Sequence, residues 1–134
     1  MDHYNHTRRR WANGDIDPTQ LKAMLLNAHA FDPAHENVSA VEADEVHGNG
    51  WTEGGEPLAN ATLTTTGTNE ATLDADDIVV GADGGSIGPA TQFVIYQDVD
   101  TEEYVLYHDD FQGTEEAGDG TDFRIDWHEN GIAR

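Results

Sequence analysis

The residues of this chain that could do chemistry are mainly carboxylates and histidines. Asp98, Asp100 and Glu102 alternate as the first ligands of a calcium loop do. The turn of an EF-hand needs glycine at the sixth position of the loop, where Glu103 stands in this chain. We therefore interpret residues 98–103 as the acidic tip of a hairpin.

Seven histidines raise the question of a metal site. His3 and His6 are three residues apart, a spacing that puts two rings on one face of a helix. No third ligand lies near them in the sequence, and no pattern like HExxH is present. We expect surface histidines, and we predict neither a metal nor a cofactor.

Few residues are arranged for covalent or phosphate chemistry. The two serines, Ser39 and Ser86, do not lie in a nucleophile elbow. The glycine-rich segment 81–88 has no Gly-Lys-Ser/Thr ending. A pair of carboxylates could hydrolyse a glycosidic bond, but no pair stands out from the acidic background. We predict no catalytic residue, and an acidic hydrolase remains an alternative.

The only concentrated positive charge is the run Arg8, Arg9 and Arg10, with Tyr4 before it and Trp11 after it. Arginine and tryptophan are enriched among the residues that dominate binding interfaces. We predict that these five residues bind carboxylates of a partner subunit. The alternative is an ordinary exposed turn of a helix.

One large aromatic residue, Trp51, is embedded in the turn-forming segment 48–55. An exposed tryptophan can stack on a sugar ring. Trp51 is therefore a candidate for stacking on a glycan, and with exposed tyrosines it would suit a tail or adsorption component that binds a host surface glycan.

The strongest compositional feature is acidity. The chain has 27 acidic and 6 basic residues and a formal net charge of −21 over 134 residues. Such a surface repels itself at low ionic strength, whereas in molar salt the Debye length falls to about 3 Å. The same excess would repel a phosphate backbone. We predict a folded protein of a halophilic system that does not bind nucleic acid directly.

Length and patterning indicate one folded domain rather than an acidic disordered chain. Hydrophobic residues make up 37% of the sequence, and aromatic residues occur along its whole length. Cysteine is absent, which excludes disulfides and thiolate metal sites. No apolar run approaches the length of a membrane span, and residues 1–6 lack the apolar core of a signal peptide.

The N-terminal part of the sequence mixes helix and strand signals. Residues 2–12 favour a short helix that stops at Asn13-Gly14. Asp17-Pro18 has the form of a helix start, but the apolar run 21–26 also suits a strand. A short helix is expected near residues 38–43.

From residue 59 onward the apolar residues alternate with polar ones, as in strands. Residues 59–67 and 71–74 form one expected hairpin, residues 78–80 a short strand, and residues 93–96 and 104–107 a second hairpin buried on both faces. In the last strand, Phe123, Ile125 and Trp127 point one way while Arg124, Asp126 and His128 point the other. The sequence predicts a mainly β fold: an antiparallel β-sandwich or barrel of about six to seven strands with a short N-terminal helix.

The order of these motifs resembles a family of small virion structural proteins of tailed bacterial and archaeal viruses. The pieces that carry the resemblance are Ile16-Asp17 with Leu21–Leu26, Glu45–Gly55, Ala71–Asp77, the tyrosine strand ending at Tyr96, Asp110-Phe111 and Phe123–Ile132. The family usually has a strand where this chain has residues 21–26, so the resemblance implies a strand there. It implies no catalytic residue. The acidity and the arginine run depart from the family pattern and suggest a haloarchaeal virus.

These observations lead to one set of expectations. Residues 1–14 are expected to form a helical anchor and residues 15–134 a single β domain. The protein is expected in the virion as a non-catalytic capsid decoration or cement protein that binds capsid subunits, forms homo-oligomers in the particle and contacts no membrane. An acidic haloarchaeal domain of non-viral origin is a further alternative. The expected core residues are Leu63, Leu73, Phe93, Ile95, Leu106, Phe123, Ile125 and Trp127.

Overall fold

The computed structural model describes residues 2–67 and 70–127, with the backbone alone for residues 65–67, 70 and 71. The fold is mainly β, with 45% strand and 13% helix, and its sheets are antiparallel. The strands are β1 (Asp2–His3), β2 (Leu21–Leu26), β3 (Glu45–Val46), β4 (Glu56–Pro57), β5 (Thr62–Gly67), β6 (Glu70–Asp74), β7 (Ile78–Gly81), β8 (Ile87–Gln97), β9 (Val105–Ala117) and β10 (Asp122–Ile125). The helical elements are α1 (Thr7–Ala12) and the 3-10 turns η1 (Pro18–Gln20), η2 (Val38–Ala40) and η3 (Glu42–Asp44).

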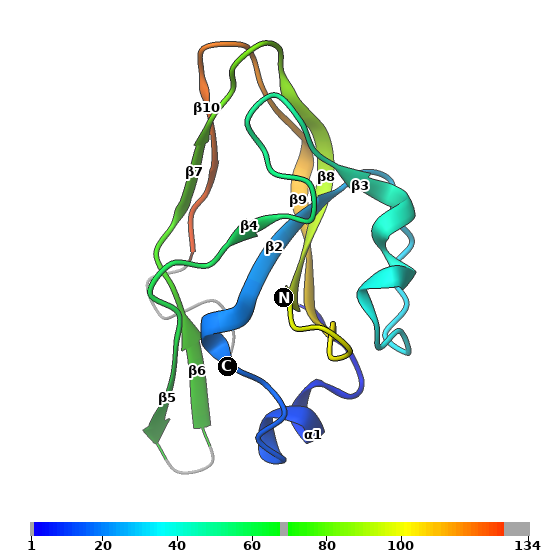
Figure 1. Cartoon of the computed structure of the whole chain (residues 1–134), viewed down its shortest axis with the longest axis vertical. Coiled ribbons are helices and arrows are strands. Elements are labelled where there is room, and N and C mark those ends of the chain that lie inside the picture. The colour runs from blue at the N-terminus through cyan, green and yellow to red at the C-terminus, as the bar shows by residue number, and fades with distance from the viewer. Residues whose placement is uncertain (1, 68–69, 128–134) are drawn as a thin grey trace.

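A six-stranded sheet forms the centre of the molecule. Its order is β1-β9-β8-β2-β3, and β4 pairs with β2 as well. The strands β7 and β10 form a separate ribbon, and β5 and β6 form a hairpin. Figure 1 shows the ribbon on one side of the sheet and the segment that holds η2 and η3 on the other. The result is the β-sandwich-like fold that the sequence predicts, and the described residues form seven strands of four or more residues.

The central strands are buried on both faces because consecutive side chains enter different cores. In β2, Ala23 and Leu25 belong to the core under the ribbon, whereas Met24 and Leu26 belong to the core on the opposite face. Phe93 and Ile95 of β8 likewise alternate with Val94 and Tyr96. Burying one such side chain stabilises the fold by about 1.5–3 kcal/mol.

Each face of the sheet is covered by a different part of the chain. Ile78, Phe123 and Ile125 of the ribbon pack on one face, where Trp51 and Leu58 complete the core. On the other face the cover comes from Val38 and Val41, beside Tyr4 from the N-terminal segment. Residues from both ends of the chain thus close the two cores.

Residues 21–26 form a strand, as the family resemblance implies. The helix start at Asp17 is real, because its carboxylate accepts a hydrogen bond from the backbone N–H of Thr19, but the helical turn ends at Gln20. From Leu21 onward the backbone pairs with β8 on one side and with β3 and β4 on the other. These pairings satisfy the backbone polar groups of a segment that has no exposed face.

The N-terminal helix is shorter than predicted. It begins at Thr7 rather than at Asp2, because residues 2–3 pair with β9 as strand β1. The backbone N–H of Tyr4 then donates to the carbonyl of Leu106, which extends the contact with β9. The residue types of segment 2–12 favour a helix locally. Residues 2–3 instead pair with the edge of β9, so the expected first turn of the helix does not form.

Six of the eight expected core residues are buried, and two are not. Leu63 on β5 is 40% exposed, because the β5–β6 hairpin does not lie in the main sheet. Trp127 is half-buried, with its backbone N–H bound to the Asp77 carboxylate and its indole N–H bound to the carbonyl of Asp76. The prediction that His128 faces outward falls outside the described residues.

Candidate interaction surfaces

Helix α1 is attached to β9 by side-chain hydrogen bonds from both of its ends. The Thr7 hydroxyl donates to the carbonyl of Leu106 at 2.7 Å. The His6 ring is 2.7 Å from the carbonyl of Val105, and the Trp11 indole N–H donates to the Tyr107 hydroxyl at 2.9 Å. Six residues would form a marginal helix on their own. These contacts hold α1 in place.

The arginine run divides between the protein body and the solvent. The Arg10 guanidinium lies 3.6 Å from the centroid of the Tyr104 ring, and its nitrogens lie 3.5 Å from Glu36 and 3.7 Å from Asp15. Arg8 and Arg9 are exposed. Arg9 reaches Glu36 at 3.4 Å between two exposed side chains, a pair that contributes little stability.

The structure therefore separates the five residues predicted to bind a partner. Tyr4 is 1% exposed and belongs to the core on the face of the sheet that η2 and η3 cover. The prediction that Tyr4 is a surface contact was therefore wrong. Trp11 is half-buried and Arg10 is stacked on Tyr104. Among the described residues, Arg8 makes no hydrogen bond or ion pair, and it forms with Arg9 the basic face of α1.

The prediction of glycan stacking by Trp51 was also wrong, because this side chain is 1% exposed and packs edge-to-face on Phe123 at 5.5 Å. Its loop folds inward: Gly48 and Trp51 exchange backbone hydrogen bonds, and Gly55 follows with a φ of +101°. A Cβ at Gly55 would lie 2.4 Å from the carbonyl oxygen of Ala23, so only glycine lets the loop approach β2 this closely. Every phenylalanine, tyrosine and tryptophan is buried or half-buried.

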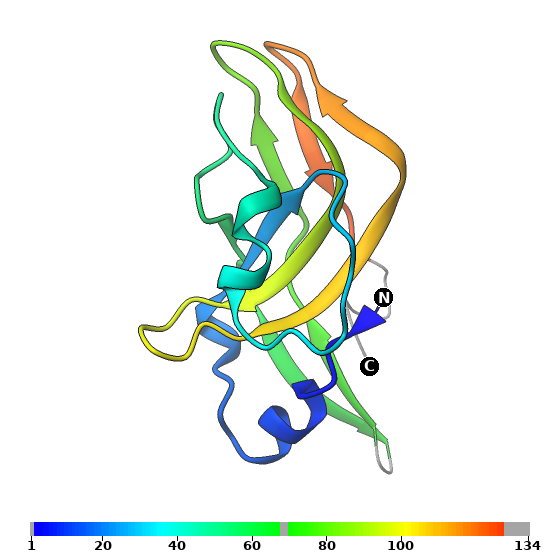
Figure 2. The same ribbon diagram turned by 90° about the vertical axis from the view of Figure 1, so that its right-hand side faces the viewer.

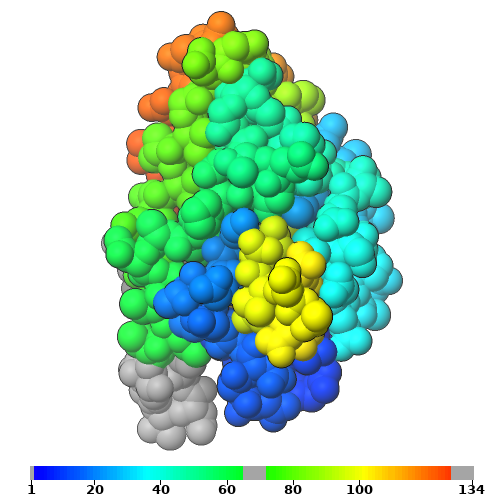
Figure 3. Space-filling view, in the orientation of Figure 1, coloured from blue at the N-terminus to red at the C-terminus, as the bar shows by residue number. Residues whose placement is uncertain are grey.

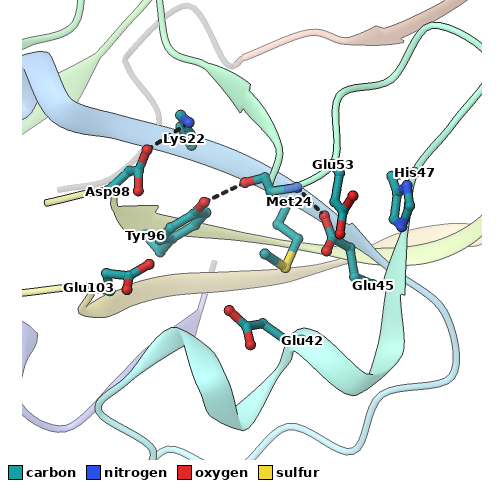
Figure 4. A pocket seen from close by; sticks show the side chains of 10 residues that line it. Lys22, Met24, Glu42, Glu45, His47, Glu53, Tyr96, Asp98 and Glu103 are labelled. Carbon is teal, nitrogen blue, oxygen red and sulfur yellow. Dashed lines mark hydrogen bonds and ion pairs between the residues drawn. The ribbon is translucent and has the colours of Figure 1, made fainter. Parts of the chain in front are cut away.

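An acidic pocket of about 490 Å³ opens on the face of the sheet that carries η3. Its floor is formed by Met24 of β2 and Tyr96 of β8, and Figure 4 shows carboxylates arranged around them. In Figure 3 the 98–103 turn (yellow) lies on this face beside the segment that contains η2 and η3 (cyan). The charged residues of the lining are five carboxylates and one ammonium group: Glu42, Glu45, Glu53, Asp98, Glu103 and Lys22.

Two of these carboxylates already have partners. Asp98 holds Lys22, the only lysine of the chain, at 2.7 Å. The Glu45 carboxylate accepts a hydrogen bond from the backbone N–H of Gly54, and the Tyr96 hydroxyl donates to the carbonyl of Gly54. Burial raises the pKa of Tyr96 above its ordinary value, and the nearby carboxylates add to the increase, so its hydroxyl keeps its proton as a donor.

Three pocket carboxylates remain unpaired among the described residues: Glu42, Glu53 and Glu103. They come from η3, the loop before β4 and the β8–β9 turn, so the first and the last are 61 positions apart in the sequence. Nothing in the sequence marks these three among 27 acidic residues. Only the packing of η3, the loop before β4 and the β8–β9 turn around one pocket brings them together, and the prediction from sequence missed the pocket.

The residues considered for metal chemistry take structural positions. His3 lies in β1 and His6 precedes α1, so their helical spacing does not apply. Asp98, Asp100 and Glu102 lie in the turn between β8 and β9, as expected for a hairpin tip. Across residues 2–67 and 70–127 no group of three histidine or acidic side chains is placed to hold a metal ion.

Comparisons with known proteins assign no family to this chain: no family model, curated protein or solved structure matches it. In the part of the chain that the structure describes, no helix is long and apolar enough to cross a membrane.

Proposed function

We propose that this protein is a non-catalytic structural component of the particle of a halophilic tailed virus, a capsid decoration or cement protein that attaches through the basic face of α1. The observation that carries the proposal is the placement of Arg8 and Arg9. Both are exposed on a helix that contacts with β9 hold in place. A positive face on a protein of net charge −21 is suited to the carboxylates of a neighbouring subunit.

The composition supports a protein that works in concentrated salt. Acidic side chains keep a surface soluble better than lysine does. The chain has one lysine, and that lysine is paired with Asp98. The resemblance of the motif order to virion proteins of tailed viruses supports the placement in a particle. A tail component that binds a glycan is supported less, because Trp51 lies in the core.

Purified virus particles test the proposal. Particles are assembled with the wild-type protein or with the double variant Arg8→Ala/Arg9→Ala, and the occupancy of the protein is measured by quantitative mass spectrometry. We expect occupancy to fall at least about tenfold, because loss of a hot-spot arginine costs about 2 kcal/mol or more, and about 1.4 kcal/mol corresponds to a tenfold change in affinity.

The matched control is Arg124→Ala. Arg124 is also exposed but lies on β10 and pairs with Asp126 at 3.0 Å. This variant should keep wild-type occupancy. Absence of the wild-type protein from particles, or full occupancy by the double variant, would contradict the proposal.

A further inference from the structure

Two surfaces of the molecule carry opposite charge and do not meet within one chain. Helix α1, which carries Arg8 and Arg9, lies at the lower end of the molecule in Figures 1 and 2, below the turn of residues 98–103. The lining of the acidic pocket includes residues of β2, β8, η3 and that turn, but none of α1. Arg9 contacts Glu36, which is not part of the pocket lining.

The pocket has the chemistry that an arginine side chain requires. Its unpaired carboxylates Glu42, Glu53 and Glu103 can each accept two hydrogen bonds from a guanidinium group. Met24 and Tyr96 on the floor are 1% and 3% exposed, so the binding chemistry of the pocket comes from its carboxylates. A volume of about 490 Å³ leaves room for more than one such side chain.

We propose that the basic face of α1 in one copy binds the acidic pocket of a second copy. This inference rests on the proposed function and names a second copy of the chain as a partner of Arg8 and Arg9. The two surfaces differ, so the contact is head-to-tail, and repetition of it forms a ring or an open chain of subunits.

The net charge determines how this contact depends on salt. Two copies of charge −21 repel each other over a long distance in dilute buffer. In about 1 M salt the Debye length is about 3 Å, so the long-range repulsion disappears while ion pairs inside a partly enclosed pocket persist. Self-association should therefore increase with salt, whereas an association driven by exposed ion pairs alone decreases.

Mixing two variants tests the head-to-tail contact. Arg8→Glu/Arg9→Glu removes the basic face and keeps the acidic pocket. Glu42→Lys/Glu103→Lys removes the acidic pocket and keeps the basic face. Analytical ultracentrifugation in about 2 M KCl should show higher oligomers for the wild-type protein and monomers for each variant alone. An equal mixture should form a discrete complex of one copy of each variant, because one intact basic face then meets one intact pocket.

Matched controls separate this result from misfolding and from a general effect of charge. Glu115→Lys/Glu116→Lys changes the net charge by the same amount as Glu42→Lys/Glu103→Lys, but at two exposed positions on β9 outside the pocket. This control variant should associate like the wild-type protein. Circular dichroism should be the same for all variants. A wild-type monomer in about 2 M KCl, or the absence of a complex in the mixture of folded variants, would overturn the inference.

Particle occupancy distinguishes failure of this inference from failure of the proposed function. Copies of the chain could fail to associate while the Arg8→Ala/Arg9→Ala variant still shows reduced occupancy in the particles. In that case the arginines bind another capsid subunit, and only the head-to-tail contact is wrong. If copies associate but wild-type particles lack the protein, the self-association is correct and the virion function is wrong.

Discussion

The Nε–H of Arg10 donates a hydrogen bond to Nδ1 of His6 over 2.9 Å. Because a guanidinium group only donates, Nδ1 accepts, and the ring proton of a neutral His6 lies on Nε2. That nitrogen lies 2.7 Å from the carbonyl of Val105 and donates to it. Both ring nitrogens are thus bonded only while His6 is neutral. This pair joins the start of α1 to β9.

Protonation of His6 should therefore weaken the fold. Burial lowers the pKa of His6 below its ordinary 6.5 and Arg10 lowers it further, while the hydrogen bond to Val105 acts in the opposite direction. A lowered pKa means that the unfolded chain binds the proton more readily. The stability from neutral His6 is complete above pH 6.5 and is lost as the pH falls toward the folded pKa.

Urea unfolding at about pH 8 and about pH 5 measures this effect. The wild-type protein should lose more stability between the two pH values than His6→Gln does. His47→Gln, at an exposed histidine, should keep the wild-type pH dependence. An identical loss in the wild type and His6→Gln would show that His6 does not couple folding to pH.

Ile125→Asp should prevent folding. Ile125 is 5% exposed in the core under the ribbon, and an unpaired charge there costs at least about 4 kcal/mol. Val79, on the paired strand β7, is 46% exposed, so Val79→Asp should cost about 1 kcal/mol or less. Circular dichroism and urea unfolding in molar salt separate the two. Normal folding of Ile125→Asp would mean that β10 does not pack as described.

Gly55→Ala should destabilise the wall of the acidic pocket. The new Cβ would lie 2.4 Å from the carbonyl oxygen of Ala23, on a backbone with a φ of +101°. We expect a loss of at least about 2 kcal/mol in the free energy of unfolding. Gly118→Ala, whose Cβ would meet no atom within 4 Å, should change it by less than about 0.5 kcal/mol. Equal effects of the two variants would contradict the close approach of the loop to β2.

Salt should stabilise the monomer. The self-repulsion of 27 acidic side chains against 6 basic ones is largely screened in molar salt, so the free energy of unfolding should rise from about 0.1 M to about 2 M KCl. The variant Glu115→Gln/Glu116→Gln/Asp119→Asn removes three exposed charges and should need less salt for the same stability. A denaturation midpoint independent of KCl would argue against adaptation to a salty solvent.

Much of the β body follows from local patterns in the sequence. The two-sided apolar runs around Ile95 and Leu106 predict buried central strands, and both strands lie between two cores. The alternation of Phe123 and Ile125 with Arg124 predicts which face of β10 is buried, and the structure confirms it. Such patterns are informative because the side-chain period of a strand is a local property of the backbone.

Only the tertiary structure decided which surfaces are available for binding. Tyr4 and Trp51 have the composition of binding residues, yet both enter cores whose other walls come from distant strands. Glu42, Glu53 and Glu103 look like any other acidic residues until η3 and the β8–β9 turn meet over β2. By itself the sequence determined the acidity, the strand pattern and the single arginine run. Burial and pocket formation depend on contacts between residues far apart in the chain, so these features were decided by the packing of the fold.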